Sequence, residues 1–165
     1  MGSLVLFVCT GNTCRSPMAE VLLRLALPRT SPWRVASAGL AASDGCPASN
    51  DAVAAIAEVG GDLRGHRSRP VSPALVQEAA AIVAMTGAHA QQLFARYPAA
   101  RDKLFLLRAF DPGAPAQSNV DDPFCGSLAE YRECRDLIRR AIPGLVRFLA
   151  QPAPPVCGNP RKENP

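Results

Sequence analysis

The eight residues from Cys9 to Ser16, CTGNTCRS, place the tightest limits on how this chain can fold. A continuous apolar run at residues 3–8 precedes them and predicts a central parallel strand buried on both faces. Pro17 suits the first turn of a helix, and apolar residues recur at helical spacing as far as Ala26. The sequence therefore predicts a strand, a tight loop and a helix N-terminus in direct succession.

The chemistry of this loop follows from the cysteine that opens it and the arginine that closes it, five residues later. Backbone N–H groups of such a loop can converge on a tetrahedral oxyanion, and a guanidinium offers a planar pair of donors to the same anion. Gly11 lets the backbone approach closely, and Asn12 tolerates a left-handed conformation. We predict a phosphate-binding loop with Cys9 as the nucleophile and Arg15 as the guanidinium. Its phosphate-binding residues are Thr10, Gly11, Asn12, Thr13, Cys14 and Arg15.

We expect Cys9 to be a thiolate, because a helix N-terminus, convergent amides and Arg15 all lower the pKa of a thiol. Ser16 can donate a hydrogen bond to that thiolate. Two plainer interpretations exist: Cys9 is an inert buried strand cysteine, or Cys9 and Cys14 are half of a zinc site. The first leaves the glycine, asparagine and arginine of the loop unexplained. The second lacks another pair of Cys or His residues at ligand spacing.

The rest of the chain alternates between strand and helix patterns, which predicts an α/β fold with a parallel sheet and right-handed crossovers. Further strands are expected at residues 33–38, 80–85 and 103–107. Helices are expected at 47–59, from Pro73 after an N-cap at Ser72, at 86–97, and at 128–150, the last either continuous or interrupted near Pro143. One domain should span residues 1–150. Residues 151–165 hold five prolines and predict a disordered tail.

A long segment at residues 110–127 is rich in Pro, Gly and Asp and predicts a functional loop. Within it, Asp122-Pro123-Phe124 combines a carboxylate, a rigid neighbour and an aromatic wall. Asp122 is our candidate for the general acid that protonates a leaving group, and for the base that later activates water. From local composition alone, a solvated turn aspartate is the plainer interpretation of Asp122, and also of Asp121.

Composition argues against several other classes of protein. The net charge is only +4, and the 18 basic residues form no long block, so we expect no nucleic-acid partner. No apolar run approaches the roughly 20 residues of a membrane span, and we expect no membrane association. We see no signal peptide, which favours a reducing cytoplasm in which the six cysteines are free thiols. We expect a monomer.

The eight-residue loop and the later Asp-Pro dipeptide, in this order, resemble the low-molecular-weight protein-tyrosine phosphatase family. The similarity covers residues 3–150. Weaker matching segments are Ser37-Ala38-Gly39, Gly65-His66-Arg67-Ser68 and Met85-Thr86-Gly87-Ala88-His89. The resemblance implies a four-stranded parallel sheet flanked by helices on both faces, phosphorylated proteins as substrates, and no metal or cofactor.

The resemblance also implies roles for individual residues. It strengthens Asp122 as the acid, and it implies that Cys14 can trap an oxidised Cys9 as a reversible disulfide, which would make the enzyme redox-sensitive. The residues that hold the loop in shape would be Asn12, Ser16, Ser37 and His66. His89 is expected to be an ordinary residue in the first turn of a helix. No role is assigned to Cys46, Cys125, Cys134 or Cys157.

Two positions suggest which substrate the enzyme accepts. Thr13 stands where tyrosine-specific members usually carry a larger aliphatic residue, and the string CTGNTCRSPMAE resembles the bacterial protein-arginine phosphatases of this family. Phe124-Cys125 replaces the aromatic pair that often follows Asp-Pro in tyrosine phosphatases. Both departures favour phosphoarginine over phosphotyrosine. The alternative is a tyrosine phosphatase in which Thr13 is a tolerated variant.

Two other functions fit the same fold less well. A thioredoxin-coupled arsenate reductase needs a further pair of cysteines to relay a disulfide, and no cysteine occurs between Cys46 and Cys125. A phosphate-binding module without activity would not need Cys9, Arg15 and Asp122 together.

Overall fold

Four parallel strands form one sheet in the computed structural model, which describes residues 2–115 and 118–151. The strands are β1 (Leu4–Cys9), β2 (Arg34–Gly39), β3 (Ala79–Ala84) and β4 (Leu104–Leu106). The helices are α1 (Arg15–Ala26), α2 (Asn50–Ala57), α3 (Pro73–Glu78), α4 (Gly87–Arg96) and α5 (Leu128–Ala150), with two 3-10 helices, η1 (Pro98–Lys103) and η2 (Leu107–Phe110). The predicted α/β class and four-stranded parallel sheet are confirmed.

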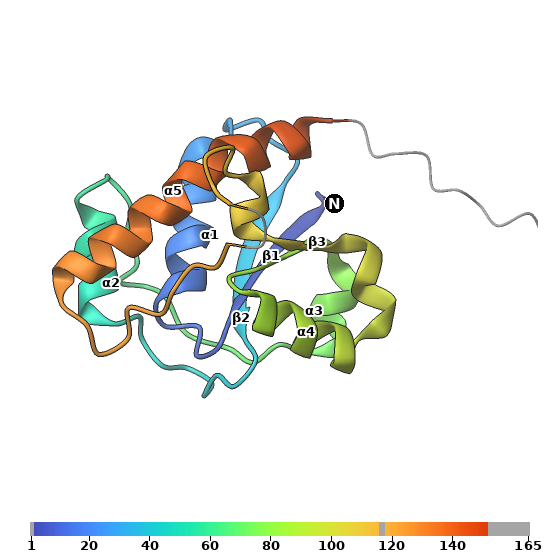
Figure 1. The fold of residues 1–165 in the computed structure, drawn as a ribbon, viewed down its shortest axis with the longest axis horizontal. Coiled ribbons are helices and arrows are strands. Elements are labelled where there is room, and N and C mark those ends of the chain that lie inside the picture. Colours follow the sequence, from blue (N-terminus) through green and yellow to red (C-terminus); the bar gives the residue numbers. More distant parts are fainter. Residues whose placement is uncertain (1, 116–117, 152–165) are drawn as a thin grey trace, which may run out of the picture.

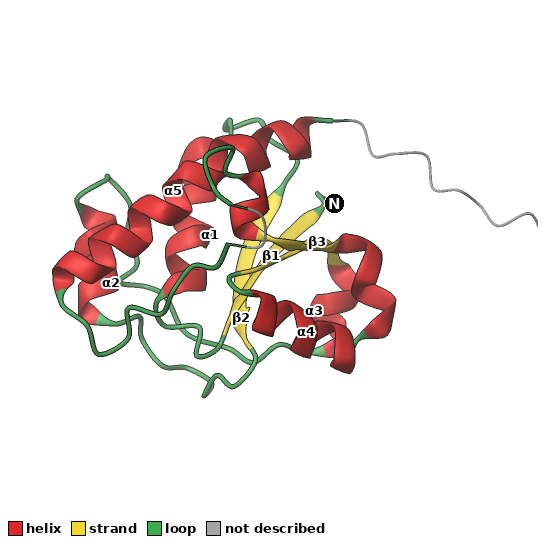
Figure 2. Ribbon diagram, in the orientation of Figure 1, coloured by secondary structure: helices red, strands yellow, loops and turns green. Residues whose placement is uncertain are grey.

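The strand order β2-β1-β3-β4 puts β1 in the middle of the sheet, where it pairs with β2 and β3. All six residues of β1 are buried, as its apolar sequence predicts. Its side chains alternate between two cores, because successive residues of a strand point to opposite faces. Val5 and Phe7 belong to the core beneath α1, α2 and α5, whereas Leu6 and Val8 belong to the core beneath α3 and α4. Figures 1 and 2 show these two helical layers on either side of the strands.

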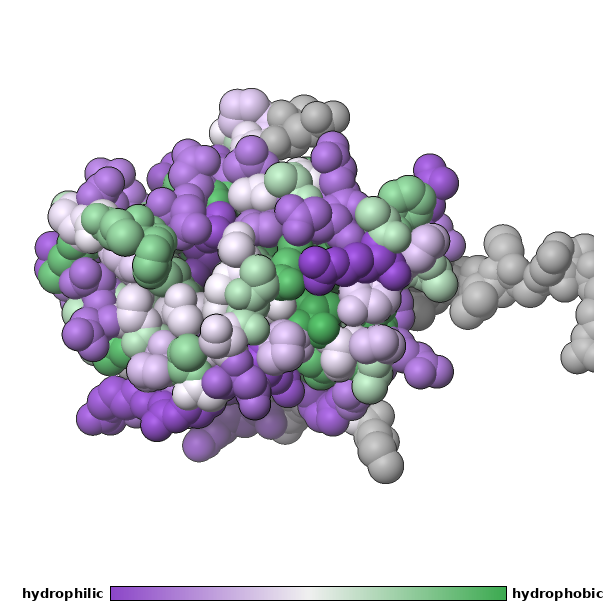
Figure 3. Space-filling view, turned by 90° about the horizontal axis from the view of Figure 1, so that it is seen from below, coloured by the Kyte–Doolittle hydropathy of each residue, from purple (hydrophilic) through white to green (hydrophobic). Residues whose placement is uncertain are grey.

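The carboxyl ends of β1 and β2 point toward the lower edge of the molecule in Figure 1. Loops from distant parts of the sequence therefore meet at that edge, as expected for a parallel sheet. The segment that carries Asp122, called the acid-bearing segment below, is held at this edge by a backbone hydrogen bond. Val120 N–H donates to the carbonyl of Met85, just beyond β3, at 2.9 Å. Figure 3 views this side and shows hydrophobic patches near its centre and also toward its left and right edges, with hydrophilic side chains between and around them.

The predicted start of the second helix is wrong. The helix does not begin at Pro47: Ser49 is the N-cap, its side chain accepts a hydrogen bond from Ala52 N–H, and α2 starts at Asn50. A serine cap satisfies a backbone donor that proline cannot, so the cap and not the proline sets the boundary. The caps predicted at Ser72 and Thr86 are confirmed. The fourth strand is shorter than predicted, because 3-10 helices flank it on both sides.

The last helix is continuous through Pro143. Proline removes one backbone hydrogen bond within a helix, but burial of a whole helical face can offset that loss. Here Ile138, Ile142, Leu145 and Leu149 are all buried in the core that α5 shares with α1 and α2. At its other end, Ser127 and Glu130 form a reciprocal capping box that fixes the first turn.

The predicted tail lies outside the described residues, except for Gln151. Among the residues that are described, no helix combines the length and apolar character needed to cross a bilayer.

Candidate active site

The loop between β1 and α1 forms the floor of the site. Cys9 ends the strand and Arg15 begins the helix, and both are buried. Asn12 has φ of 56°, the left-handed conformation that the sequence predicted it could tolerate. This turn brings Asn12 N–H to 3.3 Å from Cys9 Sγ. Ser16 Oγ lies 2.9 Å from the same sulfur.

Asn12 is the centre of a buried hydrogen-bond network that fixes this loop. Its Nδ2 donates to Ser16 Oγ and to Ser37 Oγ, both at 2.9 Å. Its backbone carbonyl accepts a 2.7 Å hydrogen bond from His66 Nε2. The structure thus brings together the four residues proposed to shape the loop, although Ser37 and His66 lie far from it in sequence.

Two members of this network were not anticipated. Arg69 N–H donates to Asn12 Oδ1 at 3.0 Å, and Ser37 Oγ donates to a carboxylate oxygen of Glu20. Since Asn12 Oδ1 accepts from a backbone amide, its Nδ2 must face the two serines. Because the contact of Arg69 is made by its backbone N–H, the residue type at position 69 could not have predicted it. Glu20 lies in α1, one turn beyond Ser16, and helical spacing could have drawn attention to it.

Asp122 meets Arg15 across 107 positions of sequence. Arg15 Nη2 donates to Asp122 Oδ2 at 2.6 Å, and Nη1 donates to the carbonyl of Val120 at 3.2 Å. Arg15 Nε is buried and has no hydrogen-bond partner among the described residues. An unpaired buried donor is costly, and an anion bound in the loop would satisfy it.

A cavity of about 300 Å³ opens above Cys9 and Arg15. Asp122 lines it, as do Thr13 and Phe124, the two residues proposed to select the substrate. Phe124 is 65% exposed, and it is the one aromatic residue among those that line this cavity. The residues that line the cavity are Cys9, Thr10, Gly11, Thr13, Cys14, Arg15, Ala41, Ser43, Cys46, Asp122 and Phe124.

Three of these lining residues, Ala41, Ser43 and Cys46, were missed from the sequence. They belong to the loop that follows β2, which carries no motif. The sequence did offer one signal: this loop follows the carboxyl end of β2, and ligands of parallel sheets bind at the carboxyl ends of the strands. Cys46 is thus a third thiol beside Cys9 and Cys14 in the wall of the cavity.

The expected lowering of the pKa of Cys9 is contradicted. Burial of the sulfur raises the pKa of the Cys9 thiol, because a buried thiolate loses its hydration. Hydrogen bonds from Ser16 and Asn12 and the charge of Arg15 act in the opposite direction but do not outweigh burial. Residue types at the loop indicated the stabilising contacts, but the depth of the sulfur was not visible in the sequence.

Cys14 is buried beneath the loop, and its sulfur lies 3.2 Å from Tyr131 Oη and 3.4 Å from Ser49 Oγ. Both partners come from other parts of the chain, at the start of α5 and the cap of α2. Cys9 and Cys14 are free thiols in this structure. The reversible disulfide between them stays a prediction.

His89 is more than the ordinary helix residue that the sequence suggested. It is buried, its Nε2 lies 2.9 Å from Thr10 Oγ1, and its Nδ1 lies 3.0 Å from Thr86 Oγ1. Burial, followed by the charge of Arg15, lowers the pKa of His89 to about 4. The imidazole is therefore neutral at physiological pH, and it links α4 to Thr10 in the loop between β1 and α1.

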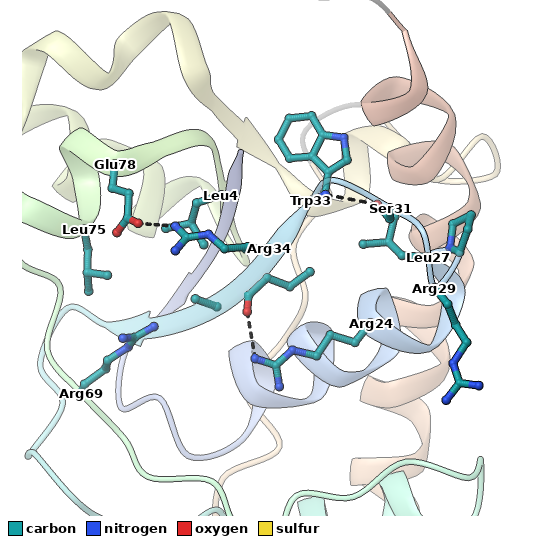
Figure 4. A pocket seen from close by; sticks show the side chains of 13 residues that line it. Leu4, Arg24, Leu27, Arg29, Ser31, Trp33, Arg34, Arg69, Leu75 and Glu78 are labelled. Carbon is teal, nitrogen blue, oxygen red and sulfur yellow. Dashed lines mark hydrogen bonds and ion pairs between the residues drawn. The ribbon is translucent and has the colours of Figure 1, made fainter. Parts of the chain in front are cut away.

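Another hollow, about 570 Å³, lies elsewhere, along the free edge of β2 (Figure 4). Arginines line it, but most of their guanidiniums already have partners. Arg24 bonds the carbonyl of Val35, Arg34 pairs with Glu78, and Arg69 Nε bonds the carbonyl of Ser37. These contacts cover the exposed edge of β2, and we assign no catalytic or binding role to this hollow.

Comparisons with known proteins agree with this geometry. Residues 4–153 match the family model described as low molecular weight phosphotyrosine protein phosphatase. A probable low molecular weight protein-tyrosine-phosphatase EpsP of Ralstonia nicotianae is 38% identical over 142 residues, which cover 86% of this chain and 92% of that protein. A protein-arginine-phosphatase of Geobacillus stearothermophilus is 39% identical over 146 residues, covering 88% and 95% respectively.

The solved structure of the YwlE arginine phosphatase from Geobacillus stearothermophilus matches with a TM-score of 0.80 at 38% identity, covering 89% of this chain and 92% of that one. The relatives named for arginine and for tyrosine are almost equally similar, so identity alone does not separate the two substrates. What they share is phosphatase chemistry, and the chain is a phosphatase. It belongs to the low molecular weight phosphotyrosine protein phosphatase family.

Proposed function

We propose that this phosphatase removes phosphate from arginine side chains of proteins. The observation that carries the proposal is the position of Thr13 in the lining of the cavity. Thr13 offers a hydroxyl there, whereas the phenyl ring of a phosphotyrosine would require an apolar contact. Thr13 Oγ1 has only a long contact, 3.6 Å, with Cys14 Sγ, so it can still bond a guanidinium. Two relatives named as protein-arginine-phosphatases, 39% and 38% identical to this chain, support the same substrate.

In the first step Cys9 Sγ attacks phosphorus. Because burial favours the thiol, Cys9 first loses its proton, which we place on a phosphoryl oxygen of the bound dianion. Arg15 and the loop amides hold the phosphoryl oxygens, and Arg15 Nε gains a partner. The S–P bond forms as the P–N bond breaks.

The leaving guanidine nitrogen takes a proton from Asp122. In the resting structure Asp122 is bound to Arg15, and the phosphoryl oxygens replace it as the partner of Nη2. The released carboxylate takes up a proton from solvent and gives it to the leaving nitrogen. In the second step Asp122 takes a proton from water, the water oxygen attacks phosphorus, and the S–P bond breaks. The Cys9 sulfur takes back the proton that it gave to the phosphoryl group, which restores the thiol.

The experiment compares kcat/KM on peptides that carry phosphoarginine or phosphotyrosine. We expect wild type to prefer phosphoarginine by at least about tenfold and Thr13→Ile to lose most of that preference, since a buried hydrogen bond to a charged group contributes about 1.5–3 kcal/mol. Thr30→Ile, the same change at an exposed turn, is the control. A wild-type preference for phosphotyrosine would show the arginine assignment to be wrong, and turnover by Cys9→Ser would remove the nucleophile.

The second candidate is a protein-tyrosine phosphatase. The exposed ring of Phe124 at the cavity favours it, because an aromatic wall can stack on a tyrosine ring. The same peptide comparison decides between the two. Protein substrates, a cytoplasmic location and a monomeric state stay predictions under either candidate.

A further inference from the structure

The proposed acid, Asp122, sits on a segment that has no regular secondary structure of its own. The described residues between η2 and α5 form turns and irregular backbone, and the Asp122 side chain is 46% exposed. A catalytic group that is misplaced by about 1 Å can lose roughly 100-fold in rate. Some part of the fold must therefore hold this segment at a fixed position relative to the phosphate-binding loop.

The first turn of α4 is in contact with the acid-bearing segment just before Asp122. Gly87 N–H, at the start of α4, donates to Asn119 Oδ1 at 2.9 Å. The first N–H groups of a helix have no partner within the helix, so this side chain satisfies an available donor. The next residue, Val120, is fully buried and bonds Met85 through its N–H and Arg15 through its carbonyl. Asp122 follows two positions later.

The same turn also contacts the phosphate-binding loop. His89 lies 2.9 Å from Thr10 Oγ1, and its other ring nitrogen lies 3.0 Å from Thr86 Oγ1. Thr86 Oγ1 in turn accepts a hydrogen bond from His89 N–H, which closes the N-cap of α4. His89 is therefore fixed by its own helix turn and holds the residue next to the nucleophile.

We propose that the first turn of α4 is a positioning element that sets the acid-bearing segment against the phosphate-binding loop, with Asn119 and His89 as its positioning residues. This inference rests on the proposed role of Asp122. Neither residue touches the phosphoryl group in this scheme. Asn119 acts through Val120 on Asp122, and His89 acts through Thr10 on the loop around Cys9.

The two contacts should fail in different ways. Loss of the Asn119 contact impairs proton donation, so it should slow cleavage of aryl phosphates with poor leaving groups more than those with good ones. Loss of the His89 contact disturbs the loop itself, so it should slow both kinds of substrate equally and weaken inhibition by inorganic vanadate.

The test measures kcat/KM on phenyl phosphate and on 4-nitrophenyl phosphate. We expect Asn119→Ala to lose about fivefold on phenyl phosphate and less than twofold on 4-nitrophenyl phosphate, in line with one exposed hydrogen bond. Asn119→Asp keeps an oxygen acceptor for Gly87 N–H and should restore wild-type values. Gln92→Ala, an exposed change on the same helix, should alter neither. Equal losses on both substrates, or no loss, would overturn the role of Asn119.

For His89 we compare Leu, which cannot bond Thr10, with Gln, whose amide can reach it. His89→Leu should lose about tenfold on both substrates and bind vanadate about tenfold more weakly, and His89→Gln should recover most of both. Unchanged vanadate binding in His89→Leu would overturn this role. Asp122→Asn is measured in parallel: if it shows no dependence on the leaving group, the acid assignment itself has failed, whereas a dependence confined to Asp122→Asn rejects only the positioning element.

Discussion

Replacing His89 should make the stability of this phosphatase less sensitive to acid. His89 is buried and neutral in the folded protein, with a pKa of about 4 against 6.5 for an unperturbed imidazole. The unfolded chain therefore binds more protons than the folded one between these two values, and stability rises with pH across this window. The contribution is fully present above pH 6.5 and is lost progressively as the pH falls toward 4.

The size of the effect follows from the two pKa values. Over the whole window it amounts to about 3 kcal/mol, and between pH 8 and pH 5 to about 2 kcal/mol. Other groups titrate over the same range, so the useful quantity is the difference between wild type and His89→Gln. Gln keeps a side chain of polar character but does not ionise.

The assay is urea unfolding at pH 8 and pH 5, with free energies taken by linear extrapolation. Wild type should lose about 2 kcal/mol more than His89→Gln on going from pH 8 to pH 5. The same loss in both proteins would refute the reasoning, because it would mean that His89 is not held neutral in the folded state. A larger loss in the variant would refute it as well.

Two further predictions concern the loop. Gly39→Ala should lower stability by about 1–3 kcal/mol and reduce kcat/KM, because a Cβ at Gly39 would lie 2.5 Å from the Thr10 carbonyl and 3.0 Å from Asn12 N. Gly65→Ala, where a Cβ would meet nothing within 4 Å, is the control for unfolding and activity measurements, and equal effects at the two positions would contradict the prediction. Ser16→Ala should raise the pKa of Cys9 further by removing its 2.9 Å hydrogen bond, and should move the pH midpoint of iodoacetamide alkylation upward. Ser3→Ala, an exposed change, should leave that midpoint in place, and a downward movement in Ser16→Ala would show that Ser16 does not stabilise the thiolate.

Local sequence was sufficient for features that depend on neighbouring residues. The apolar run before Cys9 predicted a buried strand, and Ser72 and Thr86 predicted helix caps, because burial of a continuous run and capping are decided within a few residues. The predicted helix start at Pro47 was wrong for a reason that is also local, because Ser49 caps the helix and α2 begins at Asn50. Pro143 left two outcomes open, and burial of the face of α5 decided between them.

The sequence by itself determined a loop opened by Cys9 and closed by Arg15 after a buried strand, and it predicted oxyanion chemistry at that loop. Only the tertiary structure decided how that chemistry is supported. It placed Asp122 against Arg15, Glu20 and Arg69 around the network of Asn12, and His89 beside Thr10. It also buried Cys9 deeply enough to raise the pKa of its thiol. Residue type states what a group can donate, accept or attack, but its partners and its hydration depend on segments that meet only when the sheet and its helices are assembled.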